Sequence, residues 1–323
     1  MKKLYSLLFL MLLSVGILAG CGEEETAPVE EKDAGEQVEK VEEPAFPVTI
    51  KDAIDEDVVI EAKPEKIVSL IPSNTEIAFE LGLAEEIVGV SDYDNYPEET
   101  ANKEKIGGME MNVEKIISLA PDLVLAHASS AHNSTEGLQQ LRDSGIAVLV
   151  VNDAQNFDQV FESIEMIGKA TGEQESATTL VANIKEKLEE IKTKAAEVTE
   201  KKSVFIEVSP APEIYSPAKN TFMDEMLTII NADNVLNDQE GWVQVDQEAI
   251  IERNPDVIVT TYGYYSEDPV GQVTTREGWQ NVSAVVNSQV VDIHSDLVSR
   301  TGPRLIEGVE ELAKAVYPDV FNQ

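Results

Sequence analysis

The chain has 323 residues, of which 24 are basic and 61 acidic, so its formal net charge is −37. Such a charge repels phosphate backbones and excludes a typical nucleic-acid-binding protein. A single cysteine, Cys21, excludes an internal disulfide and a cysteine-built zinc site, and three histidines leave little scope for histidine-rich metal chemistry.

Residues 1–20 read as an export signal. Two lysines open the chain, an apolar run follows, and Leu18-Ala19-Gly20 stands directly before Cys21. The apolar stretch of about 16 residues is shorter than the roughly 20 that cross a bilayer as a helix. Leu-Ala-Gly-Cys resembles the bacterial lipoprotein signal, which implies lipidation of Cys21 and a place at the outer face of the cytoplasmic membrane. The alternatives are an uncleaved membrane anchor or a buried cysteine.

Residues 21–47 are expected to form a flexible tether. The segment holds ten acidic residues against two lysines, so it contributes −8 to the net charge. It has few large apolar side chains, and repulsion between like charges keeps such a segment extended. Most of the acidity therefore belongs to the part of the chain that folds.

From residue 48 onward, short runs rich in Val, Ile and Leu alternate with helical patterns. Near-continuous apolar runs bounded by turn residues are typical of strands buried on both faces of a parallel sheet, so the alternation predicts an α/β fold. The candidate strands are Lys66–Ile71, Ile87–Val90, Asp122–Ala126, Ile146–Val151, Ser203–Val208, Val257–Thr261 and Val290–His294. The candidate helices include Thr75–Leu83, Val113–Leu119, Thr135–Ser144 and Phe157–Thr171.

One predicted helix is much longer than the others. Between Glu173 and Val198 the apolar residues recur at spacings of three and four, the pattern of a single amphipathic helix about 39 Å long. Because α/β patterns lie on both sides, we expect residues 173–199 to connect an amino-terminal lobe, 48–172, to a carboxy-terminal lobe, 200–323. The alternative is an ordinary long helix within one domain.

The two expected lobes contain a repeated sequence. Residues 113–126 and 247–260 agree at five of fourteen positions: a Glu, two Ile and a Pro-Asp pair. Each copy reads as a short helix with Asn112 or Asp246 as its N-cap, a Pro-Asp turn and a buried strand. Two similar lobes joined by a rod leave a cleft between them, which is the usual place for a ligand.

Several motifs resemble those of the cobalamin, haem and iron-siderophore binding proteins of ABC importers, with the cobalamin-binding member the most similar. The motifs that carry the likeness are Phe46–Ile50, Lys66–Glu76, Val88–Tyr93, Met111–Glu114, the two Pro-Asp turns, Asp296 and Pro303-Arg304. The resemblance implies two Rossmann-like α/β lobes joined by one rigid helix, as in periplasmic binding proteins with a helical backbone. It also implies a monomer without cofactor or enzymatic activity, which captures cobalamin and delivers it to a permease dimer.

The resemblance further implies how the protein meets the permease. In the family, one surface glutamate on each lobe docks into arginine pockets on the two permease copies, and the matching positions are Glu114 and Glu248. Their places in the repeat suit a two-fold partner, and exposed carboxylates can pair bidentately with arginine. The alternative is that each glutamate only complements the dipole of the first turn of its helix.

The resemblance also implies candidate ligand contacts, at the positions that match those of the family. They are Tyr93 in the first lobe, the loop Asp296-Leu297-Val298-Ser299-Arg300 in the second, and Trp242, which aligns with a tryptophan that flanks the corrin ring. Tyr264, in the cluster Tyr262-Gly263-Tyr264-Tyr265 after a predicted strand, is a further candidate. Aromatic faces on loops suit a large flat macrocycle, although any one aromatic side chain can equally serve core packing.

Met109 and His127 stand where the cobalamin-binding member has further tryptophans. This departure leaves haem open as an alternative ligand, because Met, His and Tyr side chains ligate haem iron. Met109 in one lobe and His294 or Tyr264 in the other are the candidate pair. An anionic iron-siderophore complex would need several arginines near the ligand, and only Arg300 and Arg304 lie near the expected loop.

The sequence contains no recognisable catalytic motif: a Gly-rich phosphate loop, a Gly-x-Ser-x-Gly elbow and His-Glu-x-x-His are all missing. We therefore predict a binding protein, with a lipid-anchored enzyme or adhesion module as the more remote alternative. Direct metal capture by His127, His132 and His294 with Asp296 is another alternative, although a spacing of five residues does not place two side chains on one helical face.

Overall fold

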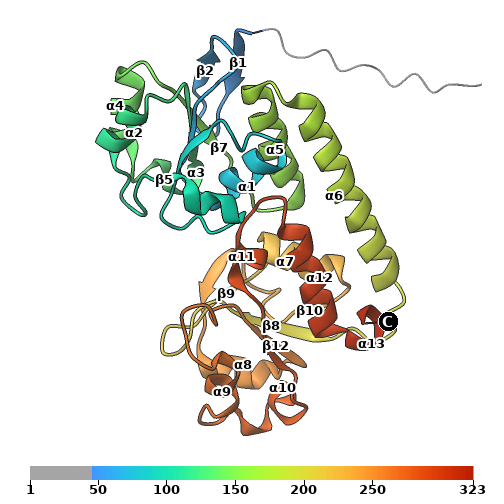
Figure 1. Cartoon of the computed structure of the whole chain (residues 1–323). Coiled ribbons are helices and arrows are strands. Elements are labelled where there is room, and N and C mark those ends of the chain that lie inside the picture. The colour runs from blue at the N-terminus through green and yellow to red at the C-terminus, as the bar shows by residue number, and fades with distance from the viewer. Residues whose placement is uncertain (1–45, 323) are drawn as a thin grey trace, which may run out of the picture. The chain divides into compact units, whose positions relative to one another are not determined.

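The computed structural model describes residues 46–322, so the predicted signal, Cys21 and residues 21–45 of the predicted tether lie outside the described part. Two α/β lobes follow one another along the chain, coloured blue to green and yellow to red in Figure 1. The α/β fold with two parallel sheets, expected from the alternating pattern, is confirmed. No helix within residues 46–322 is long and apolar enough to cross a membrane.

The first lobe is built on a five-stranded parallel sheet with strand order β5-β4-β3-β6-β7. Its strands are β3 (Ile67–Ser69), β4 (Ile87–Val90), β5 (Glu104–Lys105), β6 (Leu123–His127) and β7 (Ala147–Val151). Every residue of β3 and β6 is buried, which explains why these strands appear in the sequence as continuous apolar runs. An antiparallel hairpin of β1 (Val48–Lys51) and β2 (Asp57–Ile60) precedes the sheet.

Helices pack around this sheet. They are α1 (Pro72–Glu80), η1 (Glu98–Asn102), α2 (Val113–Leu119), α3 (Ala128–Ala131), α4 (Thr135–Asp143) and α5 (Phe157–Thr171). α5 has the predicted bounds because Asn156 caps its first turn and Gly172, with φ +79°, ends it in a conformation that suits glycine. α1 begins three residues before the predicted start, at Pro72, whose fixed φ suits the first helical position.

The long helix α6 (Gln174–Ala195) connects the lobes and runs along the side of both in Figure 1. Its buried residues recur at spacings of three and four: Ala177, Val181, Ile184, Leu188, Ile191 and Ala195. This face packs against α5 of the first lobe and against helices of the second lobe. One amphipathic stripe therefore contributes to the packing of both lobes.

The second lobe has a four-stranded parallel sheet with strand order β10-β8-β12-β13. Its strands are β8 (Ser203–Glu207), β10 (Asp233–Asn234), β12 (Val257–Thr260) and β13 (Val290–Asp292), and an antiparallel pair is formed by β9 (Tyr215–Pro217) and β11 (Trp242–Gln244). The helices are α7 (Phe222–Ile229), α8 (Gln247–Arg253), α9 (Pro269–Thr274), η2 (Trp279–Asn281), α10 (Ser283–Val286), α11 (Ser295–Ser299), α12 (Leu305–Val316) and α13 (Pro318–Phe321).

The sequence repeat is also a structural repeat. Asn112 accepts a hydrogen bond in the first turn of α2, and Asp246 does the same in α8. The aspartate of each Pro-Asp turn then holds the start of the neighbouring strand. Asp122 Oδ2 accepts from the amide of Lys66 at 2.9 Å before β3, and Asp256 Oδ2 accepts from the amide of Ser203 at 2.9 Å in β8. The same sequence signal therefore sets the strand register in both lobes.

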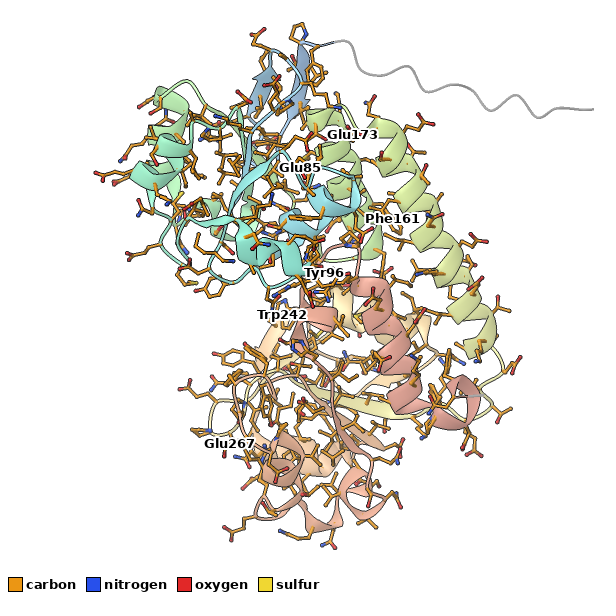
Figure 2. The ribbon with its side chains drawn as sticks, in the orientation of Figure 1. Glu85, Tyr96, Phe161, Glu173, Trp242 and Glu267 are labelled. Carbon is orange, nitrogen blue, oxygen red and sulfur yellow. The ribbon has the colours of Figure 1, made fainter. Side chains whose placement is uncertain are left out.

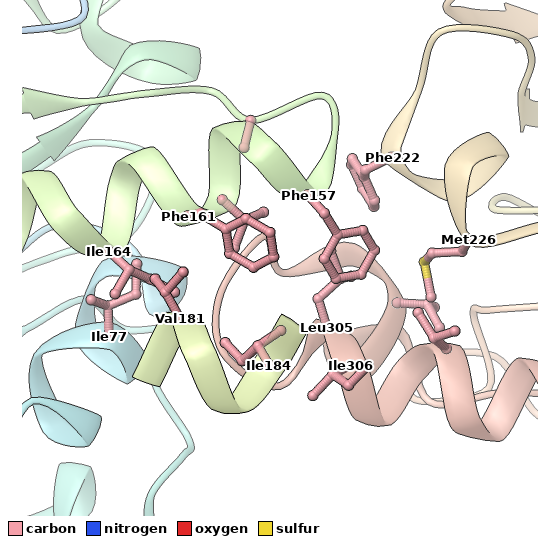
Figure 3. Close-up of a cluster of buried hydrophobic side chains, with 14 of the residues drawn as sticks. Ile77, Phe157, Phe161, Ile164, Val181, Ile184, Phe222, Met226, Leu305 and Ile306 are labelled. Atoms are coloured by element: carbon pink, nitrogen blue, oxygen red, sulfur yellow. The ribbon is translucent and has the colours of Figure 1, made fainter. Parts of the chain in front are cut away.

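The largest apolar core is continuous from one lobe to the other. It joins Phe157 of α5 with Ile184 of α6, and these with Phe222 of α7 and Leu305 of α12 (Figure 3). A hydrogen bond also crosses the lobes, from the amide of Phe157 to the Glu225 carboxylate at 2.7 Å. The lobes are therefore held together by buried apolar surface as well as by α6.

Candidate functional site

Four of the candidate ligand residues follow the carboxyl ends of parallel strands. Tyr93 follows β4 and Met109 follows β5 in the first lobe, whereas Tyr264 follows β12 and Asp296 follows β13 in the second. Because the strands of each sheet run parallel, their carboxyl ends share one edge. That edge is where open α/β sheets usually bind ligands.

Tyr93 and Met109 are the exposed candidates of the first lobe, with 53% and 86% of their surface accessible. Tyr93 lies against the Gly107-Gly108 turn, where a Cβ on Gly108 would be only 3.0 Å from the Tyr93 hydroxyl oxygen. Gly107 has φ +103°, which other residues rarely adopt. The two glycines therefore shape the turn that carries Met109 and allow Tyr93 to approach the backbone.

Trp242 of β11 is 44% exposed. Its ring packs on Phe222, with centroids 5.7 Å apart and planes inclined by 56°. Phe222 belongs to the core that joins the lobes, so the indole is fixed on one side and open on the other. Figure 2 shows Trp242 and Tyr96 in the region where the first lobe meets the second.

Tyr264 belongs to a row of exposed rings after β12. Its ring meets that of Tyr265 edge to face, with centroids 4.7 Å apart, and lies 6.4 Å from the ring of His294. The turn depends on Gly263, because a Cβ there would lie 2.2 Å from a carboxylate oxygen of Asp292. The amide of Gly263 donates to the same carboxylate at 3.2 Å. A tight glycine turn thus presents an aromatic surface at the end of the sheet.

Of the three histidines named as metal candidates, His127 and His294 cap the start of short helices, and His132 is an exposed residue at the end of α3. His127 is only 4% exposed, and its Nδ1 accepts from the amide of Ser129 at the start of α3. Burial lowers the pKa of His127, and the charge of Asp153 offsets this in part. His294 lies beyond β13, which ends two residues earlier than predicted, and accepts from the amide of Asp296. Within the described part of the chain, no three His, Cys, Asp or Glu side chains are grouped to hold a metal ion.

The segment expected to be a ligand loop, Asp296 to Arg300, is instead mostly the short helix α11. Five residues are too few to reveal a helical period in a sequence, which is why the helix is missed. Val298 is buried in the joint core and Leu297 packs against that core, so the side chain of Val298 has almost no surface open to a ligand. The Ser299 hydroxyl donates to the carbonyl of its own helix at residue 295. The polar ends of the segment, Asp296 and Arg300, reach the first lobe.

Five polar side chains form one connected network across the lobes, and we call them the Glu76 cluster: Glu76 of α1, Asn95, Asp296, Arg300 and Arg304. Arg300 Nη1 donates to Glu76 Oε1 and to Asn95 Oδ1, both at 2.8 Å. Arg304 donates to Glu76 from Nε at 3.0 Å and from Nη2 at 2.8 Å. The Asn95 amide donates to Asp296 Oδ2 at 2.9 Å, and Arg300 Nη2 lies 3.0 Å from the same oxygen.

Sequence reasoning misses the role of Glu76 and Asn95. Glu76 is 1% exposed within a helix whose residues from Pro72 to Ala78 are all buried. A charged residue in a run of otherwise uncharged buried positions is the available signal, because a buried carboxylate needs a cationic partner. The partners Arg300 and Arg304 lie more than 220 positions away along the chain, so local pattern does not identify them.

A second buried ion pair lies within the second lobe. Glu207, at the carboxyl end of β8, accepts two hydrogen bonds from Arg276 at 2.7 and 2.9 Å. The Tyr262 hydroxyl donates to Glu207 at 2.6 Å. Burial, and then the charge of Glu207, raise the pKa of Tyr262, so its hydroxyl stays protonated and keeps donating. The pair thus anchors the residue that begins the row of tyrosines.

All five arginines of the chain lie in the described part, and each contacts a carboxylate. The pairs are Arg142 with Glu56, Arg253 with Asp238, Arg276 with Glu207, and both Arg300 and Arg304 with Glu76, at distances from 2.7 to 3.1 Å. The guanidinium groups are therefore already neutralised by side chains of the protein.

Glu114 and Glu248 occupy equivalent surface positions in the two copies of the repeat. Each lies in the first turn of its helix, α2 or α8, and each is exposed. Within residues 46–322, neither carboxylate takes part in an ion pair. Each also stands where its charge complements the helix dipole. Position alone is therefore compatible both with docking on a permease and with a purely structural role in the helix.

Comparison with known proteins identifies close and distant relatives. The sequence profile of the family described as periplasmic binding protein matches residues 67–297. The chain is 51% identical over 325 residues to an uncharacterized ABC transporter substrate-binding lipoprotein, YvrC, of Bacillus subtilis, and the alignment covers 100% of both chains. It is 29% identical over 257 residues to a vitamin B12-binding protein of Vibrio cholerae, with 78% of this chain and 90% of that relative covered.

Solved structures share the fold as well. A possible iron-binding, periplasmic solute-binding protein from Staphylococcus epidermidis is 38% identical, with a TM-score of 0.73, and covers 79% of this chain and 100% of its own. The periplasmic haem-binding protein RhuT from Roseiflexus sp. RS-1 is 25% identical, with a TM-score of 0.72, and covers 79% of this chain and 99% of its own. The relatives therefore agree on two α/β lobes, while their named ligands differ.

Proposed function

This chain belongs to the periplasmic binding protein family, and we propose that it captures a corrinoid between its lobes and delivers it to a permease. It is a substrate-binding lipoprotein of an ABC transporter, held at the outer face of the membrane, and the family is not enzymatic. A permease and a small-molecule ligand are thus its partners. The finer assignment concerns which ligand the protein carries and which side chains hold it.

We favour a corrinoid over haem and siderophores because every arginine of the chain is already paired with a carboxylate. Haem carries two propionates and many ferric siderophores are anionic, so such ligands need cationic partners that are free to bind them. Arg300 and Arg304, the two candidates near the site, are committed to Glu76. A corrinoid carries neutral amide side chains around a flat ring, which suits exposed aromatic faces and hydrogen-bonding groups. The vitamin B12-binding relative of Vibrio cholerae supports the same ligand.

In this proposal Tyr93 and Trp242 pack against the macrocycle, one from each lobe, with Tyr264 extending the aromatic surface. All three are between 44% and 64% exposed, although each is held by neighbouring groups. Asp296 and Arg300 act mainly through the Glu76 cluster, and His127 and Val298 are too buried to contact a ligand through their side chains.

Haem or another iron complex is the second candidate. The exposed thioether of Met109 and the neighbouring rings of Tyr264 and His294 are groups that ligate haem iron. The Staphylococcus epidermidis structure, named as possibly iron-binding, favours this candidate. A visible absorption titration of the purified protein with cyanocobalamin and with haemin separates the two, because their spectra differ. Dissociation constants above about 10 μM for both would refute both ligands.

For delivery, we propose that Glu114 and Glu248 dock one on each half of the permease. Their equivalent places in the structural repeat suit a two-fold partner. Reversal of both charges, Glu114→Lys with Glu248→Lys, should abolish uptake while ligand affinity remains unchanged. Glu136→Lys, on the first turn of α4, is the matched control and should leave uptake intact. If ligand affinity is lost instead, the two glutamates belong to the ligand site and the docking role is refuted.

A further inference from the structure

Glu76 is a buried carboxylate that binds two cations at once. Arg304 donates hydrogen bonds to both carboxylate oxygens of Glu76, and Arg300 donates to one of them, Oε1, at 2.8 Å. Only 1% of the Glu76 side chain is exposed, against 11% and 12% for the two arginines. Bidentate pairing of arginine with a carboxylate is among the strongest and most directional polar contacts in proteins.

The charges within the Glu76 cluster balance. Glu76 and Asp296 supply two negative charges, and Arg300 and Arg304 supply two positive ones. Asn95 satisfies the remaining polar groups by donating to Asp296 and accepting from Arg300. The cluster therefore presents no net positive charge, although it contains two of the five arginines.

The same two arginines touch the segment from Tyr93 to Tyr96, which follows β4. Arg300 Nη2 donates to the Tyr93 carbonyl at 3.3 Å, and the Arg304 guanidinium lies 3.8 Å from the centre of the Tyr96 ring. The side chain of Tyr93 in this segment is 53% exposed. Arg300 thus contacts the main chain of a proposed ligand residue, and Arg304 binds the same Glu76 carboxylate beside it.

We propose that Glu76 sets the charge selectivity of the ligand site, by occupying the two guanidiniums that would otherwise receive an anionic ligand. This inference rests on the proposed function, in that it assumes a flat macrocycle bound beside Tyr93. With both arginines held by Glu76, a carboxylate on the ligand finds no cationic partner and loses its hydration without compensation. A neutral ligand with amide groups does not incur that cost. Glu76 therefore favours neutral macrocycles over anionic ones of the same shape.

The test compares two macrocycles with the same ring: protoporphyrin IX, with two carboxylates, and its uncharged dimethyl ester, which carries two added methyl groups. Affinities are measured by fluorescence with the full-length protein in detergent at pH 8, and the readout is the ratio of the two dissociation constants. Wild-type protein should prefer the ester. Glu76→Gln keeps an accepting oxygen but removes the charge. It should increase the affinity for the acid, relative to that for the ester, by about tenfold.

Glu225→Gln is the matched control. Glu225 also contacts the other lobe, through the amide of Phe157, but it holds no arginine. Its replacement removes one carboxylate at the same junction and should leave the ratio unchanged. Asp296→Asn, which releases one contact of Arg300, should shift the ratio by about threefold in the same direction as Glu76→Gln.

Several results would overturn the role of Glu76. They are an unchanged ratio in folded Glu76→Gln protein, an equal shift in Glu225→Gln, or no binding of the acid once Glu76 is replaced. If Glu76→Gln fails to fold, the Asp296→Asn ratio decides alone, and an unchanged ratio there refutes the proposal. Cyanocobalamin titration of the wild type is a separate measurement: if it fails while the porphyrin ratio shifts, the corrinoid assignment is wrong and the selectivity role of Glu76 stands.

Discussion

Glu76 and Arg304 lie in different lobes and are joined by two hydrogen bonds, 3.0 Å from Nε and 2.8 Å from Nη2 to the two carboxylate oxygens. Beside them, the joint apolar core runs from α5 through α6 to α7 and α12. The lobes are therefore joined by a polar contact of fixed geometry, the Glu76–Arg304 pair, and by a non-directional apolar contact, the core. Movement of one lobe against the other would break the first and expose the second.

Removal of the Glu76 carboxylate should destabilise the fold strongly. Glu76→Ala leaves the guanidiniums of Arg300 and Arg304 nearly buried and deprived of their shared partner, a situation that typically costs about 3–5 kcal/mol in the free energy of unfolding. Urea denaturation measures the loss. Glu80→Ala, on the exposed end of the same helix, is the control and should change stability by less than about 0.5 kcal/mol. A loss below about 1 kcal/mol for Glu76→Ala would mean that solvent reaches the arginines readily.

Truncation of Phe157 should weaken both lobes together. Its ring is 3% exposed and lies in the core between α5 and the helices of the second lobe (Figure 3). Phe157→Ala should cost about 3–5 kcal/mol, whereas Val286→Ala, at a residue that is 63% exposed, should have little effect. Denaturation followed by circular dichroism and by tryptophan fluorescence should give one coincident transition for both variants. Two separated transitions in the wild type would show that the lobes unfold independently.

Loss of either proposed aromatic contact should weaken ligand binding without unfolding the protein. Trp242→Ala and Tyr93→Ala remove partly exposed rings, and each should reduce corrinoid affinity at least about tenfold, equivalent to about 1.4 kcal/mol. Absorption titration measures the affinity, with Val286→Ala as the control. Unchanged affinity in both aromatic variants would place the ligand elsewhere on the protein.

Asp94 should give the fold a measurable pH dependence. Burial raises the pKa of Asp94, and hydrogen bonds from Ser91 and the charge of Lys105 oppose the rise without cancelling it. Between the unfolded pKa near 3.8 and the higher folded pKa, the folded state therefore binds more protons than the unfolded state. The contribution of Asp94 to stability is fully present below that window and declines as pH rises through it.

The Asp94→Asn variant isolates this contribution from the other carboxylates. The difference in unfolding free energy, wild type minus variant, should decrease as pH rises from about 4 and become constant above the folded pKa. Denaturant titrations at a series of pH values between about 4 and 8 measure it. A difference that increases with pH would show that hydrogen bonding to the carboxylate, rather than burial, dominates at Asp94.

Local sequence signals predict most of the secondary structure because their causes are local. Leu123–His127 forms a strand buried on both faces, as its apolar run indicates, and α5 has the predicted bounds because its cap residues are adjacent to it in the sequence. The predictions fail where elements are short or where context decides. β13 ends at Asp292, and α11 replaces an expected loop, because five residues hold too little periodicity to be recognised.

Patterns within about fifteen residues predict the α/β class and the repeat, whereas the surface position of Glu114 and Glu248 is implied by the resemblance to the family. The clustering of Glu76 with Arg300 and Arg304, and the inward direction of these two arginines, follow from tertiary contacts that local pattern does not reveal. A buried charge selects its partner by distance in space. Charge pairs separated by more than 200 residues leave no periodic trace in the chain.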